Sequence, residues 1–329
     1  MRRPGARRAA RAASLDAGRA SSRPMTARAL AMSEPMRSLI PAARTASGIS
    51  YCSFGELLQG VLLEDDADFL VTLPIQKYSV STFVPDPGST EIVTQPSGKT
   101  KAAALAKVIL GRYGHNVGGT FYIDCDIPIG KGLSSSSADL LATARAIEVY
   151  MGRELPLGEL CRDMSGIEPT DGVMFAESVV YLQRKGVLWS RLGRLSGIQI
   201  LSLDEGGTID TLEYHRRARA HRHNAEHRSE FNELLERIVA AFGTRDLDEI
   251  GRVSTRSAYI NQKVNPKRHL ASVHDVCQAT RGLGLVTAHS GTCIGILYET
   301  GRAGHRENLA RAADALSGYG NIKVYDTIQ

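Results

Sequence analysis

The sequence predicts a mixed α and β protein of two domains, on three observations. The chain has 329 residues, which is more than one average domain. Its hydrophobic fraction of 43% is enough for a sizeable core, and 23% charged residues is ordinary for a globular protein. Predicted strands precede helices in the N-terminal half, whereas helices surround two or three strands in the C-terminal half. We place the boundary within 190–208, and we expect no membrane span because no apolar run reaches about 18 residues.

Alternating apolar residues and β-branched side chains predict the strands of the N-terminal half, and helical periodicity predicts its helices. The predicted strands are 48–62, which contains a glycine turn, 69–84, which Pro74 interrupts, and 119–129. The predicted helices are 99–114, which ends in a glycine stop signal, 138–151, which Gly152 follows, and 157–166. A hairpin is predicted to turn at 184–186.

The same patterns predict the elements of the C-terminal half. The predicted helices are 230–242, 247–262, 269–284 and 306–316. The predicted strands are 197–207, 285–299, which breaks at a Ser-Gly-Thr turn, and 321–328. Because no segment repeats another, a repeat architecture is not predicted.

Positive charge is concentrated in a leader before residue 46. Residues 1–45 contain ten arginines against Asp16 and Glu34, so the remainder is mildly acidic although the whole chain carries +5. We therefore expect no nucleic-acid partner. The leader is interpreted as a disordered extension or as a start codon placed too early, with a transit peptide or a basic arm as alternatives.

Neither the cysteines nor the histidines predict a metal site. The five cysteines are scattered and form no CxxC pair, which indicates a reducing compartment, and we expect a cytoplasmic protein. His289 is expected to be structural. Four further histidines lie close together but are crowded by arginines, so we expect them on a solvated face. They are His215, His221, His223 and His227.

The stretch "IPIGKGLSSSSADLLATARAI", residues 127–147, places two glycines and four serines directly before a predicted helix. A helix N-terminus leaves about four N–H groups without partners and carries partial positive charge, so it binds phosphates readily. Glycines let the backbone approach a ligand closely. The stretch therefore predicts a site for a nucleotide triphosphate, with a serine-rich helix cap as the alternative. It matches neither the P-loop nor the complete dinucleotide fingerprint.

Three motifs in this order resemble the GHMP kinases, named after galactokinase, homoserine kinase, mevalonate kinase and phosphomevalonate kinase. "PIGKGLSSSSA" (128–138) is similar to the central motif, "SFGELLQG" (53–60) lies where the first motif belongs, and "AHSGTCIGILY" (288–298) resembles the C-terminal glycine-rich motif. Within the family, "GELLQG", "EPTDGVMF", "AHSGT" and "SAYINQKVNPK" resemble the L-threonine kinases of cobalamin biosynthesis and propanediol use.

This resemblance implies a two-domain α+β fold that binds nucleotide and substrate in a cleft between the domains. A ribosomal-S5-like domain is expected over 48–195 and a ferredoxin-like domain over 196–329, with the leader 1–47 outside the match. The resemblance implies an ATP- and Mg²⁺-dependent kinase of a small hydroxylated metabolite, L-threonine foremost. A kinase of homoserine or another small alcohol and a non-catalytic ATP-binding module are the alternatives, and a homodimer is considered.

The resemblance also implies roles for individual residues. Asp171 is expected to accept the proton of the substrate hydroxyl, with an ordinary turn residue as the alternative. Ser136 is expected to bind Mg²⁺, with Ser135 as its competitor. Glu168 is expected near the metal and in catalysis, with Glu159 as its competitor. The residues expected to hold ATP are Pro128, Gly130, Lys131, Gly132, Leu133, Ser134, Ser135, Ser136, Ser137, Ser290 and Gly291.

The first motif departs from the family pattern at one position. Glu56 stands where many relatives carry lysine or arginine, so a basic group that stabilises the transition state is in doubt there. Lys131 is the candidate that supplies this positive charge, and we count it among the catalytic residues. A solvated loop lysine is the alternative interpretation.

Overall fold

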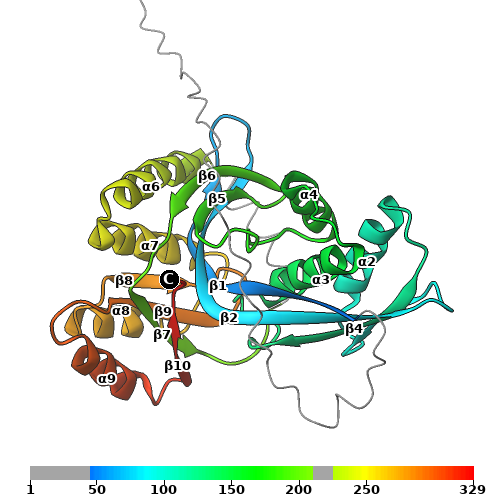
Figure 1. The fold of residues 1–329 in the computed structure, drawn as a ribbon. Helices are drawn as coiled ribbons and strands as arrows, with labels where there is room; N and C mark the ends of the chain where they lie inside the picture. Colours follow the sequence, from blue (N-terminus) through cyan, green and yellow to red (C-terminus); the bar gives the residue numbers. More distant parts are fainter. Residues whose placement is uncertain (1–44, 210–224) are drawn as a thin grey trace, which may run out of the picture. The chain divides into compact units, whose positions relative to one another are not determined.

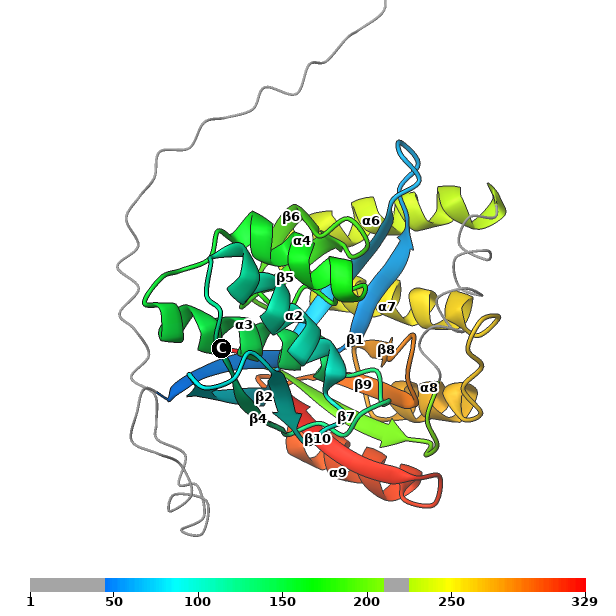
Figure 2. The same cartoon turned by 90° about the vertical axis from the view of Figure 1, so that its right-hand side faces the viewer.

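The computed structural model of the protein describes residues 45–209 and 225–329. Ten strands in these residues form one sheet, with helices packed against it (Figures 1 and 2). The main path of the sheet runs β10-β7-β9-β8-β1-β2-β4-β3, and the hairpin of β5 and β6 branches from β2.

The sheet is built around a long antiparallel hairpin of β1 (Ala46–Val61) and β2 (Asp68–Asp86). One end of β2 pairs with β4, which pairs in parallel with β3, and the other end pairs with β5. The remaining strands of this half are β3 (Ile92–Gln95), β4 (Gly118–Cys125), β5 (Ser178–Leu182) and β6 (Val187–Gly193). The predicted hairpin at 184–186 is confirmed as the turn between β5 and β6.

The predicted glycine turn in 48–62 is wrong, because β1 continues through it as one strand with irregular register. Gly55 has φ of +50°, and a Cβ atom there would lie 2.3 Å from the carbonyl oxygen of Thr287, so the strand is bent at a site of close backbone approach. Pro74 does not interrupt β2 either. Pro74 is paired with Ser53 beside the irregular part of the register. A proline is tolerated there because the regular hydrogen-bond ladder, to which it could not donate, is already interrupted.

Four strands of the C-terminal half extend the sheet beyond β1. They are β7 (Ile198–Asp204), β8 (Gly284–Thr287), β9 (Cys293–Glu299) and β10 (Asn321–Asp326). β8 joins β1 through the single pair Glu56 and Thr287, so the sheet crosses the predicted domain boundary at this point. The division at residue 195 stays a prediction.

Helices α2 (Thr100–Arg112), α3 (Ser135–Met151) and α4 (Leu157–Ile167) pack around the first half of the sheet, and α3 lies directly on β1 and β2 (Figure 2). Their apolar residues enclose a core that includes the stacked rings of Phe83 and Phe121, 4.4 Å apart. The alanine-rich sequence of α3 allows this close packing, because small side chains let the helix approach the strands.

Helices α6 (Ala225–Thr244) and α7 (Leu247–Asn261) pack beside β1, whereas α8 (Leu270–Ala279) and α9 (His305–Leu316) lie against β7, β8 and β9 (Figure 1). Their apolar faces complete two further parts of the core. The predicted helices are confirmed, with shifted ends. The short strand β3 was not predicted, since only four residues form it.

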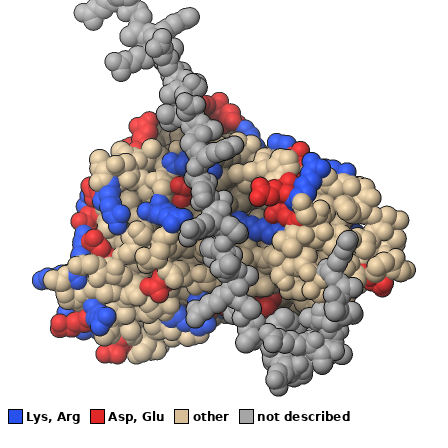
Figure 3. Space-filling model, in the orientation of Figure 1, with Lys and Arg blue, Asp and Glu red and all other residues tan. Residues whose placement is uncertain are grey.

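Two surface observations bear on partners. Among the described residues, no helix is both long and apolar enough to span a bilayer. On the part of the surface that Figure 3 shows uncovered, lysine and arginine side chains are interspersed with aspartate and glutamate.

Candidate active site

The glycine- and serine-rich loop connects β4 to α3. Gly130, Gly132 and Ser134 all have positive φ, at 80°, 72° and 60°, so the chain turns sharply three times before the helix begins at Ser135. The helix thus starts three residues earlier than predicted, and Ser135–Ser137 form its first turn. Ser134 makes no side-chain cap. Backbone N–H groups at such a helix start lack partners within the helix and can bind an anion.

The loop packs directly against the glycine-rich turn between β8 and β9. A Cβ atom on Gly132 would lie 2.7 Å from Cα of Gly291, and one on Gly291 would lie 2.0 Å from the carbonyl oxygen of Lys131. Only glycine fits at either position, because real Cβ contacts are never so short. The structure thus brings the central and C-terminal motifs into backbone contact, although they are far apart in the chain.

Lys131 is paired with a carboxylate and is therefore not a free cation. Its Nζ lies 2.7 Å from Oδ2 of Asp204 and donates to the carbonyl of Gly207. Oδ1 of the same aspartate accepts a hydrogen bond of 2.6 Å from Thr292. These contacts neutralise the lysine and tie the loop to the end of β7.

Ser136 and Glu168 form the candidate metal site. The Ser136 hydroxyl donates to one carboxylate oxygen of Glu168, and Lys101 forms an ion pair with the other. Glu159 lies elsewhere, accepting hydrogen bonds from Arg112 and from the Tyr113 hydroxyl. Of the two glutamates, the structure brings Glu168 to the serine.

This donor set is compatible with Mg²⁺. Mg²⁺ prefers oxygen ligands and usually keeps several waters, so one hydroxyl and one carboxylate suffice on the protein side. No group of three or more His, Cys, Asp or Glu side chains that could hold a metal occurs in 45–209 and 225–329. The residues present therefore suit Mg²⁺ bound together with phosphate oxygens better than a tightly caged ion.

Asp171 lies beside the first turn of α3. Its backbone N–H donates to Oγ of Ser137 at 3.2 Å, and that hydroxyl lies 3.4 Å from Oδ2 of the aspartate. Burial, with the negative charges of Glu56 and Glu168, raises the pKa of Asp171 to about 7, against the opposing hydrogen bonds from Ser134 and Ser137. The residue keeps partial solvent exposure. A carboxyl with a pKa near neutrality can exchange protons at physiological pH.

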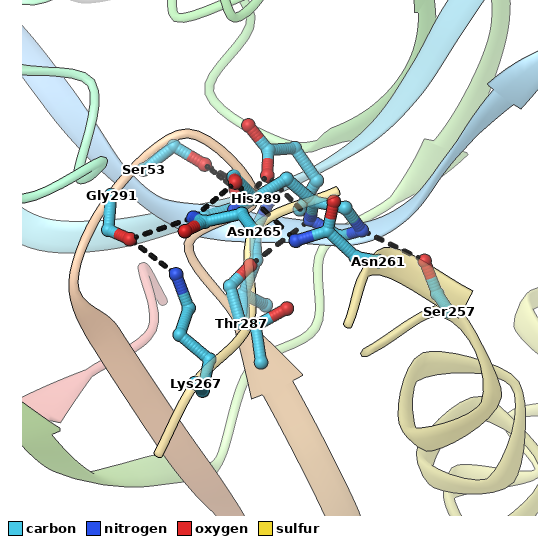
Figure 4. A network of polar contacts seen from close by, with 11 residues as sticks. Ser53, Ser257, Asn261, Asn265, Lys267, Thr287, His289 and Gly291 are labelled. Carbon is cyan, nitrogen blue, oxygen red and sulfur yellow. Dashed lines mark hydrogen bonds and ion pairs between the residues drawn. The ribbon is translucent and has the colours of Figure 1, made fainter. Parts of the chain in front are cut away.

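His289 lies in a buried polar network (Figure 4), in which Glu56 is its acidic partner. Oε2 of Glu56 accepts from both Nδ1 and the backbone N–H of His289, at 2.8 and 3.2 Å, and Nε2 of the ring lies 3.0 Å from the Ser257 hydroxyl. Asn261 and Asn265 donate to the carbonyl of His289. The structural role expected of His289 agrees with these contacts.

The segment 261–267 is the part of the site that sequence reasoning missed. Asn265 and Lys267 both donate to the carbonyl of Gly291, and Figure 4 shows the two side chains converging on it. The signal was available in "SAYINQKVNPK", which carries amide and ammonium donors just after a helix, but no local rule assigns such donors to a distant loop.

The remaining residues predicted to bind ATP, and the predicted histidine cluster, differ in their burial. Leu133 is buried in the core and anchors the loop, whereas Pro128 is exposed. Ser290 lies in the turn that covers the loop. The solvated face predicted for the histidines is wrong for His227, which is buried against Phe231 because α6 turns this side toward the core. His215, His221 and His223 lie outside the described residues.

The family description "GHMP kinases N terminal domain" matches residues 100–176, a span that includes the loop, Glu168 and Asp171. The chain is 27% identical to an L-threonine kinase of Citrobacter freundii over 258 residues, which is 76% of this chain and 85% of that one. It is 26% identical to an L-threonine kinase of Salmonella typhimurium over 80% of this chain and 85% of the relative. The chain is thus similar to the GHMP kinases over 100–176 and to L-threonine kinases over most of its length.

Solved GHMP kinases share the fold. The mevalonate kinase of Methanococcus jannaschii superimposes with a TM-score of 0.67 at 15% identity, covering 88% of this chain and 100% of that one. A homoserine kinase of Cytophaga hutchinsonii gives 0.66 at 12% identity, over 88% and 97%. The chain therefore has the two-domain α+β fold of these kinases, and it is an ATP-dependent kinase of a small molecule.

Proposed function

We propose that this kinase transfers the γ-phosphoryl group of ATP to the hydroxyl of L-threonine, giving O-phospho-L-threonine. The observation that carries the proposal is the position of Asp171 beside the helix turn that follows the phosphate loop. The similarity to two L-threonine kinases supports threonine as the acceptor. A cytoplasmic location and a role connected with cobalamin are parts of the same proposal.

In this mechanism the amides and hydroxyls of 130–137 hold the triphosphate. Ionised Asp171 accepts the proton of the substrate hydroxyl as its oxygen forms a bond to the γ-phosphorus, and the bond to the bridging oxygen breaks to release ADP. Because burial and neighbouring carboxylates raise the pKa of Asp171 to about 7, the group is basic enough to take the proton, and about half of it is ionised at neutral pH.

Ser136 and Glu168 would hold Mg²⁺, which would neutralise phosphate charge when bound. Lys101 would have to leave the Glu168 carboxylate, or share it, for this to happen. Its side chain is half exposed and long, so it can move without disturbing the core.

A coupled assay of ADP release tests the proposal. The acceptor panel should contain L-threonine, L-serine, L-homoserine, sugars and isoprenoid alcohols, each with and without Mg²⁺. We expect the highest kcat/KM with L-threonine. Preference for homoserine would change the proposed acceptor but not the proposed phosphoryl transfer. ATP binding without turnover on any acceptor would favour a non-catalytic ATP-binding module.

A further inference from the structure

Four lysines lie around the predicted phosphate site, and three of them are neutralised by carboxylates. Lys99 pairs with Asp139, Lys101 with Glu168, and Lys131 with Asp204. Lys267, the fourth, forms no ion pair with any residue that the structure describes. Its exposed fraction is only 4%, and its Nζ donates to the carbonyl of Gly291.

The surroundings of Lys267 do not explain why a charged group is buried there. Glu205 and Glu56 favour its charged form from beyond ion-pair distance, and Cys293 is the other titratable group that faces it. The oxygens of Glu205 accept instead from the backbone N–H groups of Arg268 and His269. A buried ammonium without a counter-ion is unfavourable, because a single carbonyl replaces little of its hydration.

The position of Lys267 indicates which anion its charge could favour. Its acceptor, Gly291, is in backbone contact with Lys131 and Gly132 in the phosphate loop, where a Cβ atom on Gly291 would lie 2.0 and 2.4 Å from their atoms. The ammonium therefore lies against the turn that packs on the loop, and Figure 4 shows its contact with Gly291. Positive charge in a site of low polarity acts strongly on a nearby anion.

We propose that Lys267 is a positioning residue for the triphosphate: it holds the Gly291 carbonyl and places an unneutralised positive charge behind the loop that binds the phosphates. This rests on the proposed function only in that ATP binds at this loop. Burial lowers the pKa of Lys267 to about 8, so this charge is lost as the pH rises from 7 to 9. Cys293 stays protonated over that range, since burial raises its pKa to about 11.

The test is calorimetric titration of the full chain with a non-hydrolysable ATP analogue, Mg²⁺ and, separately, adenosine. Lys267→Met is expected to weaken binding of the analogue about tenfold, the effect of losing one charge-assisted contact, and to leave adenosine unchanged. Lys267→Arg keeps the charge and should bind more tightly than Lys267→Met. Between pH 7 and 9 the unmodified chain should lose affinity severalfold more than Lys267→Met does.

Two control variants separate charge from scaffold. Lys263→Met removes an exposed lysine of the same segment and should bind like the unmodified chain. Asn265→Ala removes the other donor to Gly291 without changing charge. If it weakens the analogue as much as Lys267→Met, and both weaken adenosine equally, the charge role is overturned.

Unchanged affinity in Lys267→Met also overturns the inference, and circular dichroism checks that the variant is folded. If Lys267→Met fails to fold, Lys267→Gln takes its place under the same criteria. Absence of analogue binding by the unmodified chain would contradict the proposed function itself, and this inference with it.

Discussion

Glu56 and His289, 233 positions apart in the chain, share a buried contact in which Nδ1 of the imidazole lies 2.8 Å from a carboxylate oxygen. The contact joins the first motif to the last at the point where β8 meets β1. Glu56 also faces Asp171, whose pKa its charge helps to raise. The glutamate that stands in place of a basic residue therefore has two physical consequences: it fixes the turn at His289, and it makes Asp171 a stronger base.

Replacing Asp171 tests its role directly. Asp171→Asn should lower kcat by at least about 100-fold, since an amide cannot accept the hydroxyl proton. Binding of ATP should change little, and steady-state kinetics with titration calorimetry measure both. Asp248→Asn, which alters an exposed ion pair with Arg302, should keep full activity. Undiminished kcat in Asp171→Asn would contradict the proton-acceptor role.

The pH dependence of kcat/KM reports on the same carboxyl. Because the ionised form is the active one, the rate should rise with pH through an apparent pKa of about 7. Glu56→Gln removes a negative charge but keeps an acceptor for His289, so the acidic limb should move to lower pH by roughly half a unit to one unit. Glu64→Gln, at an exposed position, should leave the profile unmoved. An identical profile in Glu56→Gln would show that Asp171 does not sense this charge.

The two candidate metal-site glutamates can be separated by their Mg²⁺ requirement. Glu168→Gln should raise the Mg²⁺ concentration for half-maximal rate about tenfold or more, because a neutral amide is a poorer ligand than a carboxylate. Glu159→Gln should not, since Glu159 contacts Arg112 and Tyr113 instead. Equal Mg²⁺ requirements in both variants would argue against a metal at Ser136 and Glu168.

The contact between the two glycine-rich turns should be sensitive to a single methyl group. Gly291→Ala places a Cβ atom 2.0 Å from the Lys131 carbonyl oxygen, and relief of such overlap typically costs about 1–3 kcal/mol. We expect a lower midpoint of urea unfolding and weaker ATP binding. Gly301→Ala, where no atom lies within 4 Å, is the matched control and should behave like the unmodified chain. Normal ATP affinity in Gly291→Ala would mean that the turn does not support the loop.

The sequence alone predicted the helices, most strands and the glycine- and serine-rich loop before α3, because each depends on residues near one another in the chain. The helix after the glycine- and serine-rich loop and the hairpin at 184–186 are examples, since turn chemistry and helix periodicity are local. The irregular bend at Gly55 was misread as a turn, because a bulge and a turn use the same residues and only the partner strand distinguishes them.

Which charges are neutralised was decided only by the tertiary structure. Lys131 looked like a free cation and Lys267 was not singled out, yet folding pairs the first with Asp204 and buries the second without a carboxylate. Folding likewise brings Glu168, rather than Glu159, to Ser136. The sequence by itself determined the residue types, the local elements and the ordered motifs of a GHMP kinase. The electrostatics of the site came from tertiary contacts, because burial and pairing depend on groups that are distant in the chain.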